Sequence, residues 1–145
     1  MKVTFLGTGT STGIPTIGVE RESCLSSEKR DNRLRSSILI EYKSKSILID
    51  CGPDFRQQML RINKTKIDAI FFTHEHADHT AGLDDIRPIS FHHGKIPIYA
   101  HRRVVDNLKN RFDYLFDKKG DYPGSPHVYP NIINEGEIFK YEDIS

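Results

Sequence analysis

The sequence predicts a mixed α/β fold in which helices cover a sheet. Short runs rich in β-branched residues alternate with segments that carry apolar residues at helical spacing. Near the start, two apolar runs separated by a three-residue polar turn indicate an antiparallel hairpin. Because both faces of these runs carry apolar residues, we expect the hairpin to be buried on both sides. Packing helices against a sheet is the natural way to bury such strands.

Length and composition limit the classes of protein that this chain can represent. With 145 residues, the chain can build one hydrophobic core, and its 37% hydrophobic and 28% charged residues are typical of a globular protein. A net charge of +1 gives no electrostatic reason for strong nucleic-acid binding. No apolar run approaches the roughly 20 residues that cross a bilayer, so no membrane partner is expected. Two cysteines, Cys24 and Cys51, argue against a disulfide framework and favour a cytoplasmic location.

The first third of the chain contains one strand, a glycine-rich loop and the hairpin. We expect a strand over residues 3–6 and a tight loop over residues 7–13, in which glycine allows positive φ. A nucleotide-binding interpretation is rejected because the spacing is not Gly-x-Gly-x-x-Gly and no lysine ends the loop. Residues 16–36 are predicted to be a long loop. The hairpin strands are expected over residues 37–42 and 46–50.

The remainder alternates helices and strands, and three residues set expected boundaries. Asp54 is placed to cap a helix, Pro88 to stop one, and Pro97 to mark an edge strand. The expected elements are a helix over residues 54–62, a strand over 67–72, a short helix over 82–87, a strand over 96–100, an amphipathic helix over 102–117, a turn-rich loop over 122–126 and a weak strand over 138–141.

A dense cluster of metal-ligand residue types follows the strand expected over residues 67–72. His74, His76, Asp78 and His79 fall within six residues, and imidazole and carboxylate groups are the ligands of zinc and similar divalent ions. A single histidine at a strand end is usually a solvent-facing residue, but four ligand types in this order favour metal binding. The first two histidines can point to the same side, and the last two residues can reach a second ion. Two ions about 3.5–4 Å apart would share a hydroxide and clamp an oxyanion.

The order His-x-His-x-Asp-His resembles the signature of the metallo-β-lactamase-fold hydrolases. Residues 5–11, 33–37, 50–56 and 74–82 are similar to one branch, the cyclic phosphodiesterases of bacterial phosphonate utilisation and their relatives. The resemblance implies an αββα sandwich, of which this chain would be the N-terminal half. It also implies hydrolysis of a phosphodiester by a hydroxide that two divalent metal ions activate. Zinc is the first expectation for these ions, with manganese or iron as alternatives.

The same resemblance implies roles for individual residues. His74 and His76 would bind the first ion, and Asp78 and His79 the second. Asp78 would also be catalytic, by orienting the attacking water. Asp50 matches an aspartate that ends an early strand and braces the metal loop, although a plain strand terminator is the alternative.

The glycine-rich loop carries a further candidate role. Backbone N–H groups of Gly9, Thr10 and Ser11 would line the metal cleft and hold the substrate phosphate. The alternative is that this segment is a tight loop and nothing more. No donor for the leaving-group proton is assigned.

One departure from the resembled branch concerns a cysteine cluster that binds a structural zinc. Val19 and Arg21 stand where two of the cysteines are expected, and Cys24 remains. One thiolate cannot make such a site, so no structural zinc is predicted. Cys24 and Cys51 are expected to be inert thiols.

A second departure concerns ligands from the later half of the fold: a further histidine, a bridging aspartate and a last histidine. His92, His93, His101 and His127 do not lie in matching contexts. We therefore expect residues 1–145 to be the N-terminal part of a single metallo-hydrolase domain, incomplete at its C-terminus and inactive on its own. Such a part would expose one side of its core, and homo-oligomer formation would cover it.

The predicted function is that of a metal-dependent phosphodiesterase acting on a small-molecule substrate. The alternatives are other hydrolases of this fold, acting in RNA 3′-end processing or on a lactone or thioester, since a fold does not define a substrate. A nucleic-acid partner is not favoured, because the net charge is small and no basic patch rich in aromatic residues is present. If the 145 residues are the biological chain, a non-catalytic metal-binding or interaction module is the rival.

Overall fold

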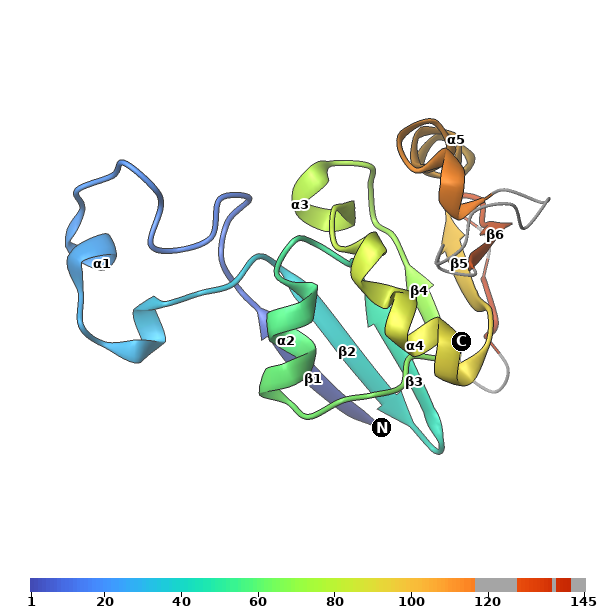
Figure 1. The fold of residues 1–145 in the computed structure, drawn as a ribbon, viewed down its shortest axis with the longest axis horizontal. Helices are drawn as coiled ribbons and strands as arrows, with labels where there is room; N and C mark the ends of the chain where they lie inside the picture. The colour runs from blue at the N-terminus through green and yellow to red at the C-terminus, as the bar shows by residue number, and fades with distance from the viewer. Residues whose placement is uncertain (117–127, 137, 142–145) are drawn as a thin grey trace.

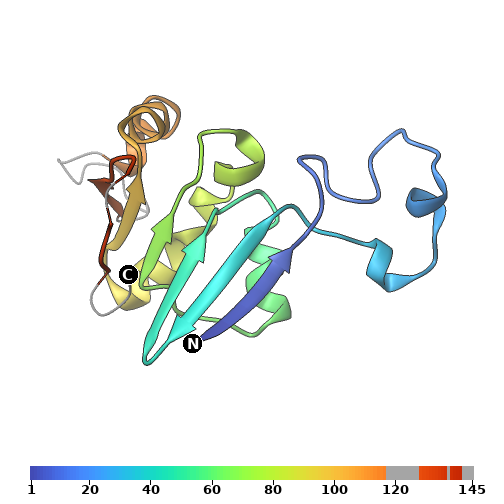
Figure 2. The same ribbon diagram turned by 180° about the vertical axis from the view of Figure 1, so that it is seen from behind.

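The computed structural model describes residues 1–116, 128–136 and 138–141. A six-stranded sheet has the order β1-β2-β3-β4-β5-β6, so each strand lies beside its neighbour in sequence (Figures 1 and 2). β1 and β3 are both antiparallel to β2, whereas the strands from β3 to β6 run parallel. The predicted mixed α/β class is confirmed. The strands are β1 Lys2–Gly7, β2 Ser37–Tyr42, β3 Lys45–Ile49, β4 Ala69–Phe71, β5 Ile96–Ala100 and β6 Val128–Ile132.

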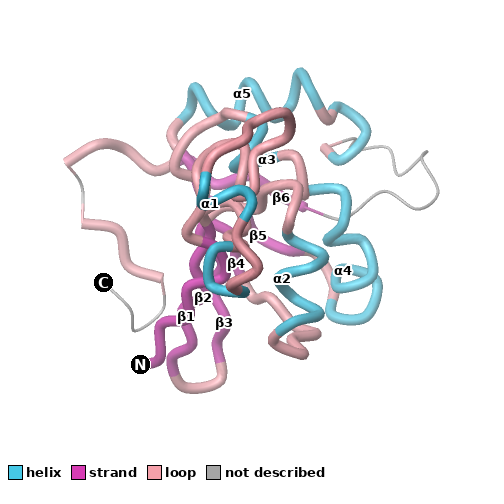
Figure 3. Tube along the Cα trace, turned by 90° about the vertical axis from the view of Figure 1, so that its left-hand side faces the viewer, coloured by secondary structure: helices cyan, strands magenta, loops and turns pink. Residues whose placement is uncertain are grey.

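Helices connect the parallel strands and cover one face of the sheet. Figure 3 shows α2 and α4 together on one side of the strands. Among the described helices, none has the length and apolar character needed to cross a lipid bilayer. The helical elements are α1 Glu22–Leu25, η1 Lys29–Asp31, α2 Phe55–Arg61, α3 Ala77–Thr80, η2 Leu83–Ile86, α4 Arg87–His93, α5 Arg102–Arg111 and η3 Asp113–Leu115.

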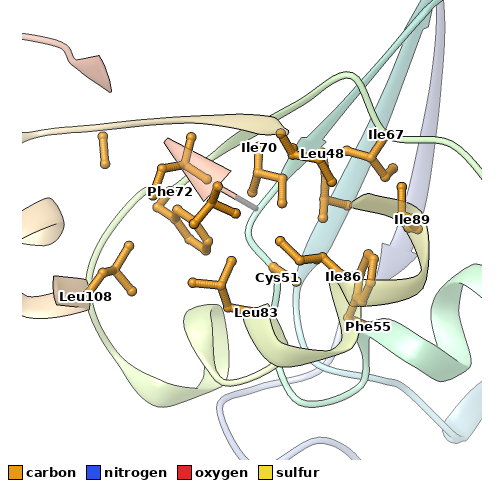
Figure 4. Packing of buried hydrophobic residues seen from close by; sticks show 14 of the residues in the cluster. Leu48, Cys51, Phe55, Ile67, Ile70, Phe72, Leu83, Ile86, Ile89 and Leu108 are labelled. Carbon is orange, nitrogen blue, oxygen red and sulfur yellow. The ribbon is translucent and has the colours of Figure 1, made fainter. Parts of the chain in front are cut away.

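The hydrophobic core lies between the sheet and these helices (Figure 4). Leu48 and Ile70 pair across β3 and β4 and are fully buried, and Phe55 of α2 packs in the same cluster. Complete burial of each such side chain contributes about 1.5–3 kcal/mol. This core fixes the positions of the strand ends that carry the candidate ligands.

The opposite face of the sheet differs from the expectation that the hairpin is buried on both sides. Phe5 pairs with Ile38, and Val3 pairs with Ile40, so these four side chains share that face. Val3 is 47% exposed and Phe5 65% exposed, while the two isoleucines are half-buried. The expectation is wrong for β2, because no second layer covers these residues in the described part of the chain.

Two proline-based expectations are also wrong. Pro88 does not stop a helix; it lies in the first turn of α4, where a missing N–H costs nothing. Pro97 does not mark an edge, because β5 pairs with β4 on one side and β6 on the other. The pairing with β4 covers Ile98 and Tyr99 only, so the proline precedes that ladder.

Boundaries near the C-terminus differ as well. The helix expected over residues 102–117 ends at Arg111, and a short 3-10 turn follows it. The weak strand expected over residues 138–141 is not formed as a strand, and the missed strand is β6. β6 contains Pro130, which obscures the strand pattern in the sequence. The loop expected over residues 122–126 lies outside the described residues.

The glycine-rich loop and the long loop lead away from the sheet and return to it at β2. Gly13 has the positive φ expected in this loop, at 70°. Residues 16–36 are mostly loop, as predicted, with the short α1 and η1 turns inside them. Asp54 does not cap α2 with its side chain. Its carboxylate instead accepts hydrogen bonds from Arg35, from the backbone N–H at 2.8 Å and from Nη1 at 3.0 Å.

Candidate metal centre

The candidate ligands lie where two neighbouring parallel strands end. β3 ends immediately before Asp50, and β4 ends shortly before His74. The Asp50 N–H donates to the carbonyl of Phe71 at 2.8 Å, which holds the two strand ends together. The carboxyl edge of parallel strands is the usual place for a binding site in an open α/β sheet.

Asp50 is the hub of this edge. Its side chain is buried, and its φ of 61° is a left-handed conformation that is uncommon for a residue other than glycine. The two carboxylate oxygens accept three hydrogen bonds. Oδ1 accepts from the Thr73 N–H at 2.8 Å, and Oδ2 accepts from Thr73 Oγ1 at 2.8 Å and from His79 Nδ1 at 2.7 Å. Backbone strain of this kind is concentrated at functional sites.

These hydrogen bonds define which ring nitrogen of each histidine is free. An ionised carboxylate only accepts, so the proton in this contact is on Nδ1 of His79, and Nε2 is the nitrogen that faces Asp78. The single proton of Thr73 Oγ1 goes to Asp50. Nδ1 of His74, 3.0 Å from that hydroxyl oxygen, must therefore donate to it. Both histidines thus offer Nε2 as a potential metal ligand.

The other candidate ligands lie in the same cluster. The ring centroid of His74 is 4.7 Å from that of His76 and 4.0 Å from that of His79. Oδ2 of Asp78 is 3.1 Å from Nε2 of His79. Two donors that bind one ion at about 2.1 Å each lie roughly 3–3.5 Å apart, so this pair fits a shared ion.

The donor set fits divalent metal ions, but the described residues do not complete a site. Three imidazoles and one carboxylate are the ligand types of zinc, and also suit manganese or iron. Within the described residues, however, no group of three or more His, Cys, Asp or Glu side chains is arranged to hold an ion. The cluster therefore provides pairs of ligands rather than a full coordination sphere. Metal binding by these four residues stays a prediction.

Close backbone contact fixes the second half of the cluster against the end of β3. The Cys51 N–H donates to the carbonyl of His79 at 2.8 Å, and the Gly82 N–H donates to the carbonyl of Cys51 at 2.9 Å. A Cβ on Gly52 would lie 2.0 Å from the carbonyl oxygen of Asp78. Only glycine permits this approach, so α3 is docked in one position.

Three residues that the sequence reasoning missed also hold the cluster. Thr73 connects Asp50 with His74, as described above. Glu75 faces α5, where Arg103 Nη2 lies 3.2 Å from its Oε2. The pKa of the Glu75 carboxyl is lowered, first by its own backbone N–H and then by Arg103, against the opposing effect of burial. Arg111 donates to the carbonyl of Glu75 at 2.9 Å. Position in the motif identifies Thr73 and Glu75, whereas nothing in the sequence separates Arg111 from other arginines.

The structure does not link the proposed phosphate loop to the histidine cluster by hydrogen bonds. Among the described residues, no hydrogen bond joins Gly9, Thr10 or Ser11 to residues 73–79. The Gly9 N–H already donates to the carbonyl of Leu34 at 2.7 Å, so it is not available to a phosphate in this arrangement. The carbonyl of Ser11 accepts from Arg35 Nε at 2.8 Å. A phosphate-binding role for this loop stays a prediction.

In the described part of the chain, the side chains of the other histidines and of both cysteines form no hydrogen bond with the four candidate ligands. Nδ1 of His101 accepts from the Arg103 N–H at the start of α5, and the exposed His92 and His93 lie on α4. His127 lies outside the described residues. Both cysteines are free thiols: Cys24 is half-buried, and Cys51 is fully buried. Burial raises the pKa of the Cys51 thiol well above its ordinary value.

A cavity of about 520 Å³ lies beside the metal loop. Ile49, Phe71 and Phe72 provide apolar walls, and Thr73, His101 and Glu135 contribute polar groups. This volume lies within the usual range for a small-molecule site.

A six-stranded sheet with helices on one face and a His-x-His-x-Asp-His segment at its carboxyl edge defines the metallo-β-lactamase-fold class. The chain matches the family model of the β-lactamase superfamily domain over residues 45–145, and it belongs to that family.

Similar proteins have several names. A crystal structure of a diphosphatase from the PhnP family aligns with a TM-score of 0.80 and 43% identity, covering 91% of this chain and 50% of that chain. An octanoyltransferase of Porphyromonas gingivalis is 46% identical over 146 residues, which is all of this chain and 29% of that protein. A ribonuclease Z of Methanosarcina acetivorans is 34% identical, covering 94% of this chain and 41% of that protein. Zinc-bound PqqB of Methylobacterium extorquens, at 21% identity and a TM-score of 0.76, shows the shared fold. The chain therefore spans no more than half the length of the diphosphatase, the octanoyltransferase or the ribonuclease Z.

Proposed function

We propose that this chain supplies the His-x-His-x-Asp-His half of the two-metal centre of a hydrolase that cleaves a small phosphodiester. The observation that carries the proposal is the Asp50 hub. Asp50 binds Nδ1 of His79 directly, and it binds Thr73, whose hydroxyl contacts Nδ1 of His74. In both histidines Nε2 is therefore the nitrogen that can bind a metal ion. The 43% identity to a diphosphatase supports phosphoryl chemistry in particular.

The ligands divide into two pairs. His74 and His76 would hold one divalent ion, and Asp78 and His79 the other, with zinc as the first expectation and manganese or iron as alternatives. When bound, such ions supply water that ionises near neutral pH and positive charge for the phosphoryl oxygens. Because zinc takes about four ligands, further donors must come from elsewhere in the protein.

The chain's own residues would orient the reactants. Oδ2 of Asp78, which is 3.1 Å from His79 Nε2, would accept a hydrogen bond from the attacking water and direct it. Asp50 would keep the imidazole of His79 in one tautomer and orientation. The cavity beside Thr73 would receive the organic part of the substrate. The group that protonates the leaving oxygen is not among the residues of this cluster.

A second candidate function is RNA 3′-end processing, which the 34% identity to a ribonuclease Z favours. The chain's net charge of +1 weighs against it, because neutralisation of phosphates by Lys and Arg supplies most of the affinity for RNA. The name octanoyltransferase gives no separate argument for residues 1–145, since the match covers 29% of that protein.

The test measures metal content and turnover on the 145-residue protein, with His76→Ala and the matched control His93→Ala, an exposed histidine on α4. Bis(p-nitrophenyl) phosphate and a precursor tRNA with a 3′ trailer are the two substrates.

Up to two ions per chain and phosphodiester turnover, both lost in His76→Ala and kept in the control, would support the proposal. Trailer removal without phosphodiester turnover would favour the second candidate. Because further metal donors must come from elsewhere in the protein, metal binding that is lost in His76→Ala, without turnover of either substrate, would support the ligand pairs but not the substrate class. Metal near zero in all three proteins would overturn the proposal for this chain.

A further inference from the structure

α5 contacts the segment that carries the four candidate ligands at two places, one near each end. Glu75 lies between His74 and His76, in the extended part of the segment. Thr80 follows His79 and ends the short α3 helix. A group that binds both Glu75 and Thr80 therefore fixes one pair of ligands relative to the other.

Arg111 makes both contacts with a single nitrogen. Nη1 donates to the carbonyl of Glu75 at 2.9 Å and to Oγ1 of Thr80 at 3.0 Å. The Thr80 hydroxyl in turn donates to the carbonyl of His76 at 2.9 Å. The guanidinium, the hydroxyl and two backbone carbonyls thus form a closed hydrogen-bonded bridge across the ligand segment. A charged donor makes hydrogen bonds roughly twice as strong as those between neutral groups.

The support behind this bridge is rigid. α5 packs into the core through Val104, Val105 and Leu108, all at or near complete burial. The ring of Phe112, which packs against the core, lies under the guanidinium at 5.2 Å and restrains its orientation. Arg103 adds an ion pair with Glu75, although both arginines are exposed residues and water screens an ion pair at such a position.

We infer that Arg111 is a positioning residue for the candidate metal centre, which sets the spacing between the His74–His76 pair and the Asp78–His79 pair. The inference rests on the proposed function for its chemical consequence. Its structural part, that Arg111 orders residues 74–80, is independent of metal binding. None of the contacts of Arg111 uses an imidazole or carboxylate of the ligands, so its effect on them is indirect.

The first experiment is amide hydrogen exchange on the metal-free 145-residue protein. The variants are Arg111→Ala, Arg111→Lys and Lys109→Ala, an exposed residue of the same helix that serves as the matched control. We expect peptides spanning residues 74–81 to exchange at least tenfold faster in Arg111→Ala, with the sheet strands unchanged. Lys109→Ala should match the wild type. Arg111→Lys should be intermediate, because an ammonium retains the charge but lacks the planar fork of donors. Equal exchange in wild type and Arg111→Ala would overturn the inference.

The second experiment is titration with cobalt(II), followed by its visible absorption, which depends on the geometry of the ligands. Loss of an outer-shell partner commonly costs 10–100-fold in metal affinity, and we expect about a tenfold loss in Arg111→Ala, partly restored in Arg111→Lys. An unchanged affinity and an unchanged spectrum in Arg111→Ala would overturn the positioning role even if exchange accelerates. If the wild type binds no cobalt, the proposed function fails for this chain, while the exchange comparison still decides whether Arg111 orders the segment.

Discussion

Nδ1 of His79 lies 2.7 Å from Oδ2 of Asp50, although 29 residues separate them in sequence. The contact joins the end of β3 to the loop after β4, and parallel pairing of those strands makes it geometrically accessible. It also makes Nδ1 the nitrogen that donates to Asp50, because the carboxylate can only accept. Sheet topology therefore determines which atom of His79 is presented as a ligand.

Replacement of Asp50 by Asn should separate the structural and chemical parts of this relationship. The amide keeps the size of the side chain but carries no charge, and its NH₂ cannot accept the hydrogen bonds made by one of the two carboxylate oxygens. We expect metal affinity to fall about 10–100-fold and stability to fall by about 1–3 kcal/mol. Calorimetric metal titration and urea unfolding measure the two effects. Asp106→Asn, an exposed acid of α5, is the control, and equal losses in both variants would contradict the role of Asp50.

The two cysteines should react very differently with a thiol reagent. Burial raises the pKa of the Cys51 thiol, so the thiolate that reacts is scarce at neutral pH, and the side chain is fully buried. We expect one fast equivalent from the half-buried Cys24 and a second only on unfolding. The measurement is labelling with dithiobis(nitrobenzoate) at pH 8 with and without urea. In Cys24→Ser, the fast phase should vanish; a fast phase that persists there would show that Cys51 is accessible. A fast equivalent from Cys24 would itself contradict the expectation that both thiols are inert.

Local patterns in the sequence were sufficient for most of the fold. Richness in β-branched residues gives β2 at its observed bounds, and helical spacing gives α2 within one residue at each end. Three of the failures lie at Pro88, Pro97 and Pro130. A proline lacks a backbone N–H, and the structural effect depends on where the proline lies. It is tolerated in the first turn of a helix or where a strand position needs no donor, and only the tertiary structure decides which case applies.

In the candidate site, too, some features follow from local sequence and others only from the tertiary structure. The motif indicates the four candidate ligands, and the family resemblance indicates the supporting role of Asp50. Position next to the motif marks Thr73 for attention, whereas the contribution of Arg111 depends on which helix packs against the motif, and nothing in the sequence indicates that helix. The sequence allows two interpretations of the glycine-rich loop, a phosphate contact in the cleft or a tight loop, and in the structure the Gly9 N–H donates to the carbonyl of Leu34. A glycine allows both close packing and ligand contact, and sequence does not distinguish them.

Gly52 should tolerate no side chain. A Cβ there would lie 2.0 Å from the carbonyl oxygen of Asp78, a backbone atom that cannot move without displacing α3. We expect Gly52→Ala to cost about 3 kcal/mol, in the range for overpacking, and to weaken metal binding. Gly18→Ala is the control, because a Cβ at this position meets nothing within 4 Å. Its only strain is the positive φ of Gly18, and we expect this strain to cost about 1 kcal/mol of stability. Thermal unfolding and metal titration of both variants test this, and equal effects would argue against the close approach.

The ion pairs of Glu41 should make stability depend on pH in a definite direction. Hydrogen bonds from Lys64 and then from Lys2 lower the pKa of the Glu41 carboxyl below its ordinary value of 4.5. A group with a lowered folded pKa stabilises the protein above its unfolded pKa, and this contribution is lost as the pH falls through the folded pKa. Lys64→Met should therefore cost about 0.2–1 kcal/mol at pH 7 and almost nothing at pH 2.5. Urea unfolding at both pH values measures this, with Lys109→Met as the exposed control. A loss of equal size at pH 2.5 would assign the effect to packing of the lysine stem.

Among the described residues, nothing covers the outer face of β1 and β2, and this predicts self-association of the 145-residue protein. Phe5 is 65% exposed beside Val3, Ile38 and Ile40, and contiguous apolar surface of this kind is a typical interaction site. We expect the apparent mass to rise with concentration, and Phe5→Ser to shift the equilibrium toward monomer by at least tenfold. Because the side chain is mostly exposed, the folded monomer should lose little stability.

Leu60→Ser supplies a matched control for this last prediction. Leu60 is 64% exposed and lies on α2, which covers the other face of the sheet (Figure 3). Any general effect of removing an exposed apolar side chain appears in both variants, whereas an effect of the sheet face appears only in Phe5→Ser. Size-exclusion chromatography with light scattering over a hundredfold range of concentration distinguishes them. A wild type that stays monomeric throughout, or equal shifts in the two variants, would show that this face does not drive association.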